Sequence, residues 1–124
     1  AQKLLPGYPL LDAQLEALLC ESLPYLRVPP SQHYMRAPGW MEEAGLREIS
    51  VHTYVSTISG SQDADGQASM ACTYDMLYGA VRAKLPPQQQ ECMARITDPH
   101  SDDFLPKRSD FVAHITYSVF WGHK

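Results

Sequence analysis

Chemically versatile side chains gather at the end of a proline-rich segment, residues 24–38. His33, Tyr34 and Arg36 offer an imidazole, a phenol and a guanidinium, and Trp40 follows them closely. Together they could supply a general base, a hydrogen-bond donor, a fixed cation and an aromatic wall to one small organic substrate. We treat the first three as candidate catalytic residues and Trp40 as a candidate substrate contact. The alternative is that all four are surface side chains of an irregular loop.

A second group of candidates lies on a segment with helical periodicity, residues 67–85. Met70, Tyr74 and Tyr78 recur at a spacing of four and could line a substrate pocket under the proline-rich segment. Asp75 adjoins Tyr74, and a buried carboxylate at this position could act as a general acid or base. Asp75 is therefore a fourth candidate catalytic residue. The alternatives are simple core packing for the apolar face and solvent exposure for the carboxylate.

The histidines and cysteines predict neither a metal site nor a disulfide framework. His52 and His114 fall in two segments with strand-like composition and could approach each other, but no third and fourth ligand accompanies them. We expect them to be satisfied or exposed. The cysteines are odd in number, lack a C-x-x-C pair and are expected to be buried thiols in a reducing compartment: Cys20, Cys72 and Cys92.

Hydrophobic periodicity predicts four helices. Prolines begin or end most of these segments, and Gly45 suits the left-handed end of the second one. The proline-rich segment after the first helix is expected to be an ordered loop or a lid. The expected helical ranges are residues 10–23, with Asp12 as the N-cap, then 38–45, 67–85 and 88–96.

Two segments have the composition of β-strands. Residues 49–57 alternate between apolar and polar side chains, which predicts a strand covered mainly on one face. Residues 110–121 are almost wholly β-branched or aromatic, which predicts a long strand buried on both faces. Residues 59–66, rich in glycine, serine and aspartate, are expected to form a flexible loop.

Composition limits the classes of partner. The formal net charge is -4 without a clustered basic face, so no nucleic-acid partner is expected. No apolar run approaches the length of a membrane span and no signal peptide is evident, so we expect no membrane partner and a cytoplasmic location. We expect one domain, residues 1–124. Its parts are an N-terminal helix and lid (1–38), a helix and strand (39–57), inserted helices (66–97) and a terminal strand (110–124).

Two junctions resemble those of class I SAM-dependent methyltransferases. WMEEAGLREISVHTY, residues 40–54, resembles the helix, E-A-G-[FL] turn and strand that join the family's fifth helix to its sixth strand. ITYSVFWGHK, residues 115–124, is similar to the family's last strand with its W-G-[RH]-K tail. KLLPGYPLL, residues 3–11, faintly resembles the K-P-G-G turn before the fifth strand. The inserted helices and the proline-rich segment resemble the substrate cover and lid of the fungal secondary-metabolism branch.

The resemblance implies the C-terminal part of an incomplete Rossmann-like α/β fold, with residues 49–57 and 110–121 as a two-strand antiparallel edge. It also implies SAM as methyl donor, yet the glycine-rich turn [DE]-x-G-x-G-x-G has no counterpart in the 124 residues. The nearest sequence, DADG at residues 63–66, follows no apolar strand and is interpreted as loop. We therefore expect no cofactor bound by this chain alone, SAM only in a complex, and a second polypeptide or a homodimer that covers the open sheet.

Three hypotheses for function follow. The first is the substrate-side portion of a methyltransferase-like transferase of secondary metabolism that acts on a small organic substrate, with the SAM-binding part on another chain. The second is a SAM-independent isomerase or cyclase, built on the truncated fold and acting as a dimer, with His33, Tyr34, Arg36 and Asp75 as acid and base groups. The third is a non-catalytic interaction module whose inserted helices bind a regulatory protein.

Overall fold

A long two-stranded ribbon is the largest feature of the chain. The computed structural model describes residues 2–124, and its secondary structure is mixed α and β. Strands β2 (Arg47–Ser59) and β3 (Val112–His123) pair antiparallel, and β1 (Gln2–Lys3) pairs antiparallel with the other edge of β3. The sheet order is therefore β1-β3-β2. Both predicted strands and their antiparallel pairing are confirmed, although β2 is longer at both ends and β3 is shifted toward the C-terminus.

All four predicted helices are present. Within residues 2–124 these are α1 (Pro9–Ser22), α2 (Ala37–Glu43), α3 (Ala64–Tyr78) and α4 (Pro87–Thr97). Three of them carry proline in the first turn, where the missing N–H would have had no partner inside the helix. The fourth, α3, has a side-chain cap instead. The Oδ1 of Asp63 accepts a hydrogen bond from the backbone N–H of Gly66 at 2.8 Å.

Three helix boundaries differ from the expectation. Asp12 is not the N-cap of α1, because Pro9 already occupies the first helical position and Tyr8 precedes it. Residues 63–66 are not loop, since Asp63 caps α3 and the helix begins directly after it. The predicted helix to residue 85 stops at Tyr78 and is followed by a separate turn of 3-10 helix. The predicted end of α2 is confirmed, with Gly45 at a φ of 84°.

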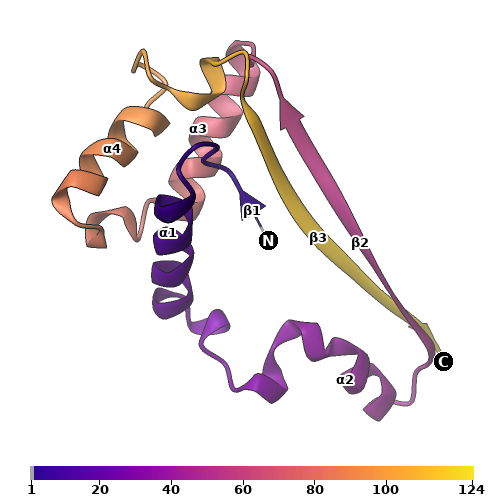
Figure 1. Ribbon diagram of the computed structural model, residues 1–124. Coiled ribbons are helices and arrows are strands. Elements are labelled where there is room, and N and C mark those ends of the chain that lie inside the picture. The colour runs from indigo at the N-terminus through magenta and orange to yellow at the C-terminus, as the bar shows by residue number, and fades with distance from the viewer. Residues whose placement is uncertain (1) are drawn as a thin grey trace.

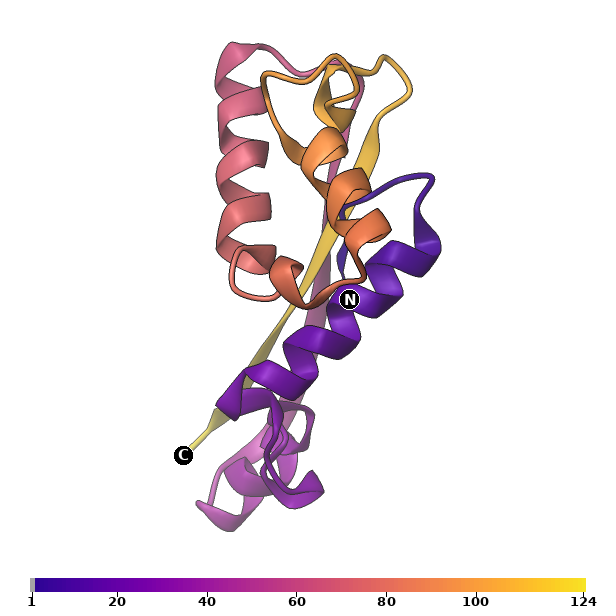
Figure 2. The same ribbon diagram turned by 90° about the vertical axis from the view of Figure 1, so that its left-hand side faces the viewer.

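Three of the four described helices, α1, α3 and α4, cover one face of the sheet at one end of the ribbon. Figure 1 shows α1, α3 and α4 to the left of the ribbon, nearer to the end of β2 and the start of β3, and Figure 2 shows the ribbon running behind them. α2 lies at the opposite end of the ribbon, close to the C-terminus (Figure 1). The core lies between the three grouped helices and the sheet, and its largest fully buried side chains include Phe104, Phe111, Leu4, Leu5, Leu15, Met93 and Ile96.

The expectation that β3 is buried on both faces is wrong. Ala113 is fully buried, but Val112 is 49% exposed, Tyr117 is 55% exposed and Trp121 is 43% exposed. The composition of β3 predicted a strand correctly and its burial incorrectly, because β-branched and aromatic residues favour strands whether or not a second layer covers them. The described helices leave the far half of this strand uncovered.

Aromatic side chains follow the core along the same face of the ribbon. Directly paired residues of β2 and β3 share a face, and Ile58 with Ala113 marks the face that meets the helices. Further along that face, Tyr54 and Tyr117 stack with their ring centroids 5.2 Å apart. We call the exposed residues of this stretch the aromatic face: His52, Tyr54, Tyr117, Val119 and Trp121.

None of the helices in residues 2–124 has both the length and the apolar character that a bilayer crossing requires.

Candidate functional site

The structure keeps the candidates of the proline-rich segment together. The prolines prevent an α-helix between α1 and α2, and this segment folds into short 3-10 turns instead. These turns hold His33 beside Tyr34, with ring centroids 4.5 Å apart. The Nδ1 of His33 accepts a hydrogen bond from the backbone N–H of Met35 at 3.3 Å. The indole N–H of Trp40 donates to the carbonyl oxygen of Ser31 at 2.9 Å. These contacts fix the segment locally.

This group lies at the surface rather than in a closed site. Tyr34 is 56% exposed and Trp40 is 40% exposed, Arg36 is exposed, and His33 is half-buried. Solvated side chains of these types can bind a ligand, but their own surroundings exclude little water. A catalytic role for the group stays a prediction, and it requires something further to cover them.

Asp75 does not join that group. It lies on α3, which packs at the helical end of the molecule, whereas the proline-rich segment leads into α2 at the other end of the ribbon (Figure 1). Its carboxylate is exposed and forms an ion pair with Arg82 at 3.3 Å. The condition on which we based its acid–base role, burial, is therefore not met. Asp75 and His33 do not belong to one constellation within this chain.

The three candidate substrate contacts on α3 are part of the hydrophobic core. Met70, Tyr74 and Tyr78 are no more than 4% exposed and pack with the leucines of the first helix. The hydroxyl of Tyr74 donates to the carbonyl oxygen of Leu4 at 3.0 Å, and burial raises the pKa of both tyrosines. Their spacing of four therefore marks the buried face of α3, which was the alternative interpretation of that pattern.

The two strand histidines do not meet. His52 pairs with Val119 and His114 pairs with Thr57, so the two positions lie five steps apart along β3, about 17 Å. Across residues 2–124, no group of three or more histidine, cysteine and acidic side chains is arranged to hold a metal ion. The expectation of buried thiols is wrong for Cys20 and Cys72, which are exposed because they lie off the buried faces of α1 and α3.

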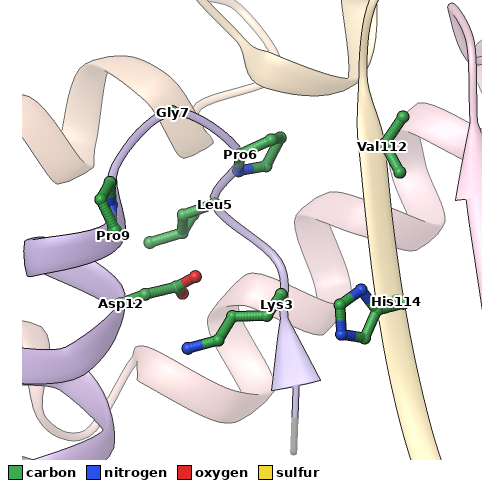
Figure 3. A pocket seen from close by; sticks show the side chains of 8 residues that line it. All are labelled: Lys3, Leu5, Pro6, Gly7, Pro9, Asp12, Val112 and His114. Carbon is green, nitrogen blue, oxygen red and sulfur yellow. The ribbon is translucent and has the colours of Figure 1, made fainter.

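A hollow at the carboxyl end of β1 brings together polar groups from three elements. Lys3 comes from β1, Asp12 from the first turn of α1 and His114 from β3, where it pairs with Lys3. Figure 3 shows the Lys3 side chain reaching from β1 toward the Asp12 carboxylate, with the His114 ring beside β1. The hollow has a volume of about 270 Å³, and its remaining lining is Leu5, Pro6, Gly7, Pro9 and Val112.

Asp12 is the unusual member of this set. It is only 6% exposed, and loss of hydration raises the pKa of its carboxyl above the ordinary value of 3.8. Neighbouring Glu16 raises the Asp12 pKa further, whereas Lys3, His114 and a hydrogen bond from the Leu5 backbone lower it. The net direction is upward. A carboxyl group held in this way can donate or accept a proton nearer to neutral pH than a solvated one.

The sequence does not predict this site, because no local pattern contains all three of its polar residues. His114 is distant in sequence from Lys3 and Asp12, and these two meet only because a tight turn with Pro6 and Gly7 folds β1 back onto α1. One signal was available. Asp12 follows Leu11 on an amphipathic helix, at a position that shares the apolar face, and a carboxylate there requires an explanation.

The arrangement is suited to binding and to proton transfer. Lys3 and His114 can hold an anionic group, the Asp12 carboxyl can exchange a proton, and the prolines and Val112 provide an apolar wall. Comparisons of the chain with protein-family models, with curated proteins and with solved structures find no match. The chemistry of the site is therefore inferred from its own residues.

Proposed function

We propose that this chain is the substrate-side part of a SAM-dependent methyltransferase-like protein, that it acts on a small organic substrate, and that the SAM-binding part lies on another chain. The proposal extends the mixed α/β fold to an incomplete Rossmann-like sheet. The resemblance of residues 40–54 and 115–124 to methyltransferase junctions supports it. The antiparallel pairing of β2 with β3 is compatible with it.

The observation that carries the proposal is the uncovered ribbon. Val51 and Val55 are 45% and 62% exposed on one face, and Tyr54 and Tyr117 are 44% and 55% exposed on the other. Among residues 2–124, only β3 pairs with β1, so the outer edge of β1 is open. Apolar sheet faces and open edges of this kind are covered in stable proteins. A second chain could cover both, with strands that pair with the β1 edge and helices that pack on the exposed faces.

Purification of the tagged chain from its native source tests this proposal. We expect intact mass spectrometry to find a second polypeptide with a glycine-rich turn of the form [DE]-x-G-x-G-x-G. We expect calorimetry to detect SAM binding to that assembly and none to the 124-residue chain. A homogeneous assembly without such a polypeptide, or SAM bound by the isolated chain, would contradict the proposal.

A second candidate function is a SAM-independent isomerase or cyclase that acts as a homodimer. The pocket of Lys3, Asp12 and His114 favours it, because all three groups come from one chain and need no cofactor for proton transfer. This function predicts that the isolated chain is a dimer and converts a candidate substrate without SAM. A monomer or a heteromer would exclude it.

A further inference from the structure

The hollow beside β1 limits its ligand first by size. Its volume of about 270 Å³ lies just below the range of roughly 300–1,000 Å³ that is typical of ligand sites in proteins. A molecule with one ring fits such a space and a larger natural product does not fit entirely. The apolar lining of Leu5, Pro6, Pro9 and Val112 favours a ligand with an apolar body.

The charged groups of the hollow limit the ligand further. Lys3 is a cation and His114 a donor on adjacent strands, and together they favour a carboxylate. The Asp12 carboxylate approaches from α1 and disfavours a second anion, but it can accept a hydrogen bond from a hydroxyl. We propose that this hollow binds a small hydroxycarboxylic acid. The carboxylate of the ligand contacts Lys3 and His114, and the hydroxyl of the ligand donates a hydrogen bond to the Asp12 carboxylate.

The surroundings of Asp12 support this assignment. Asp12 is only 6% exposed, and its carboxyl lies near the Leu5 backbone and the side chains of Lys3, Glu16 and His114. No ion pair of 4 Å or less joins Asp12 to Lys3 within the part of the chain that the structure describes. The carboxylate therefore keeps acceptor capacity for a ligand hydroxyl.

A second hollow, between Tyr8 and Phe111, is less suited to a ligand. Its volume is about 380 Å³, but its charged groups, Arg108 and Asp110, already form two hydrogen bonds with each other at 2.8 Å and 2.7 Å. A ligand would have to replace these bonds. The pocket with Lys3, Asp12 and His114 has no such internal pair to break.

This inference deepens the proposed function by naming a substrate class, and its test is independent of SAM. NMR titration of the isolated chain compares benzoate, phenol and the three hydroxybenzoate isomers. We expect the best hydroxybenzoate to bind about tenfold more tightly than benzoate, because a hydrogen bond to a charged acceptor has that effect. Phenol should bind most weakly. The His114 ring signals should shift with both acids.

Two variants separate the roles of the charged groups. Lys3→Gln should weaken binding of benzoate and of hydroxybenzoate about tenfold each and leave phenol unchanged. Asp12→Asn should remove the advantage of hydroxybenzoate over benzoate. The matched controls are Lys124→Gln, at an exposed site outside the pocket, and Asp65→Asn, an exposed acid in the first turn of α3. Neither control should change any of these affinities.

Measurements on the unmodified chain keep the inference falsifiable even if a variant does not fold. Equal affinity for benzoate and for every hydroxybenzoate isomer, or no shift of the His114 signals, would overturn it. Because the titrations contain neither SAM nor a second chain, that result would leave the proposed methyl transfer standing. Conversely, failure to find a SAM-binding chain would leave a measured hydroxybenzoate preference intact.

Discussion

Asp12 makes stability depend on pH in an unusual direction. Burial raises its pKa above 3.8, so the folded chain holds this proton to a higher pH than the unfolded chain does. The Asp12 contribution to the free energy of unfolding is therefore full below 3.8 and is lost as pH rises through the raised folded pKa. Most paired carboxylates behave in the opposite way.

We predict that Asp12→Asn removes this loss. The difference in free energy of unfolding between variant and parent should shift in favour of the variant between about pH 3 and pH 7, because asparagine carries no charge to desolvate. Urea denaturation at several pH values measures it. Asp65→Asn, on an exposed first turn, should show no comparable shift. A constant difference across the pH range would show that the Asp12 carboxyl titrates like a solvated one.

The Tyr74 hydroxyl connects α3 to the start of the chain. It is buried and donates to the carbonyl oxygen of Leu4 at 3.0 Å. We predict that Tyr74→Phe lowers the free energy of unfolding by about 1–3 kcal/mol, since the Leu4 carbonyl loses its partner in a dry environment. Tyr78→Phe is the control, because no hydrogen bond of the Tyr78 hydroxyl is found among the described residues. Equal losses in the two variants would mean that the hydrogen bond contributes nothing.

At the scale of elements, the cap of α3 is the clearest local determinant. Asp63 supplies the only side-chain cap among the α-helices of residues 2–124, and its oxygen accepts from Gly66. We predict that Asp63→Ala costs about 1 kcal/mol of stability. Thermal and urea unfolding would measure the loss. Asp63→Asn, which keeps an acceptor oxygen, should recover most of it, and the absence of recovery would contradict a capping role.

Periodicity predicted the elements well because their signals are local. The spacing of Leu11 and Leu15 marked α1, and the composition of residues 110–121 marked β3 within two residues. β1 was missed because two residues carry no period, and they become a strand only where β3 pairs with them. The pocket was missed for the same reason, since it exists only after β1, α1 and β3 are brought together.

The grouping of candidate residues shows the same limit. His33 and Tyr34 were expected together and lie together, because neighbours in a short turn cannot separate. The expectation that Asp75 joins them depends on α3 lying under the proline-rich segment. In the structure α3 packs at the other end of the ribbon, and Asp75 pairs with Arg82. The buried face of α3 was visible in the spacing of Met70, Tyr74 and Tyr78, but the choice between pocket and core depended on what packs against it.

At the scale of the whole molecule, the exposed ribbon predicts association. We expect the isolated chain to self-associate with rising concentration in sedimentation experiments. The double variant Val55→Thr, Tyr117→Thr removes apolar area from both faces and should weaken association at least about tenfold. Met76→Thr is the control, since Met76 is 73% exposed on α3, away from the ribbon. A monomeric parent chain at all concentrations would contradict this expectation.

The first strand has a consequence for how the hollow opens. β1 has only two residues, yet Leu4 and Leu5, which follow it, are at most 1% exposed. Lys3 is therefore followed by two buried leucines that anchor the chain, whereas its own strand is held to β3 only by a two-residue pairing. Fluctuations that detach β1 would displace the cation from the hollow while the leucines stay buried, so occupancy by a ligand should slow amide hydrogen exchange at Lys3 far more than at Leu5.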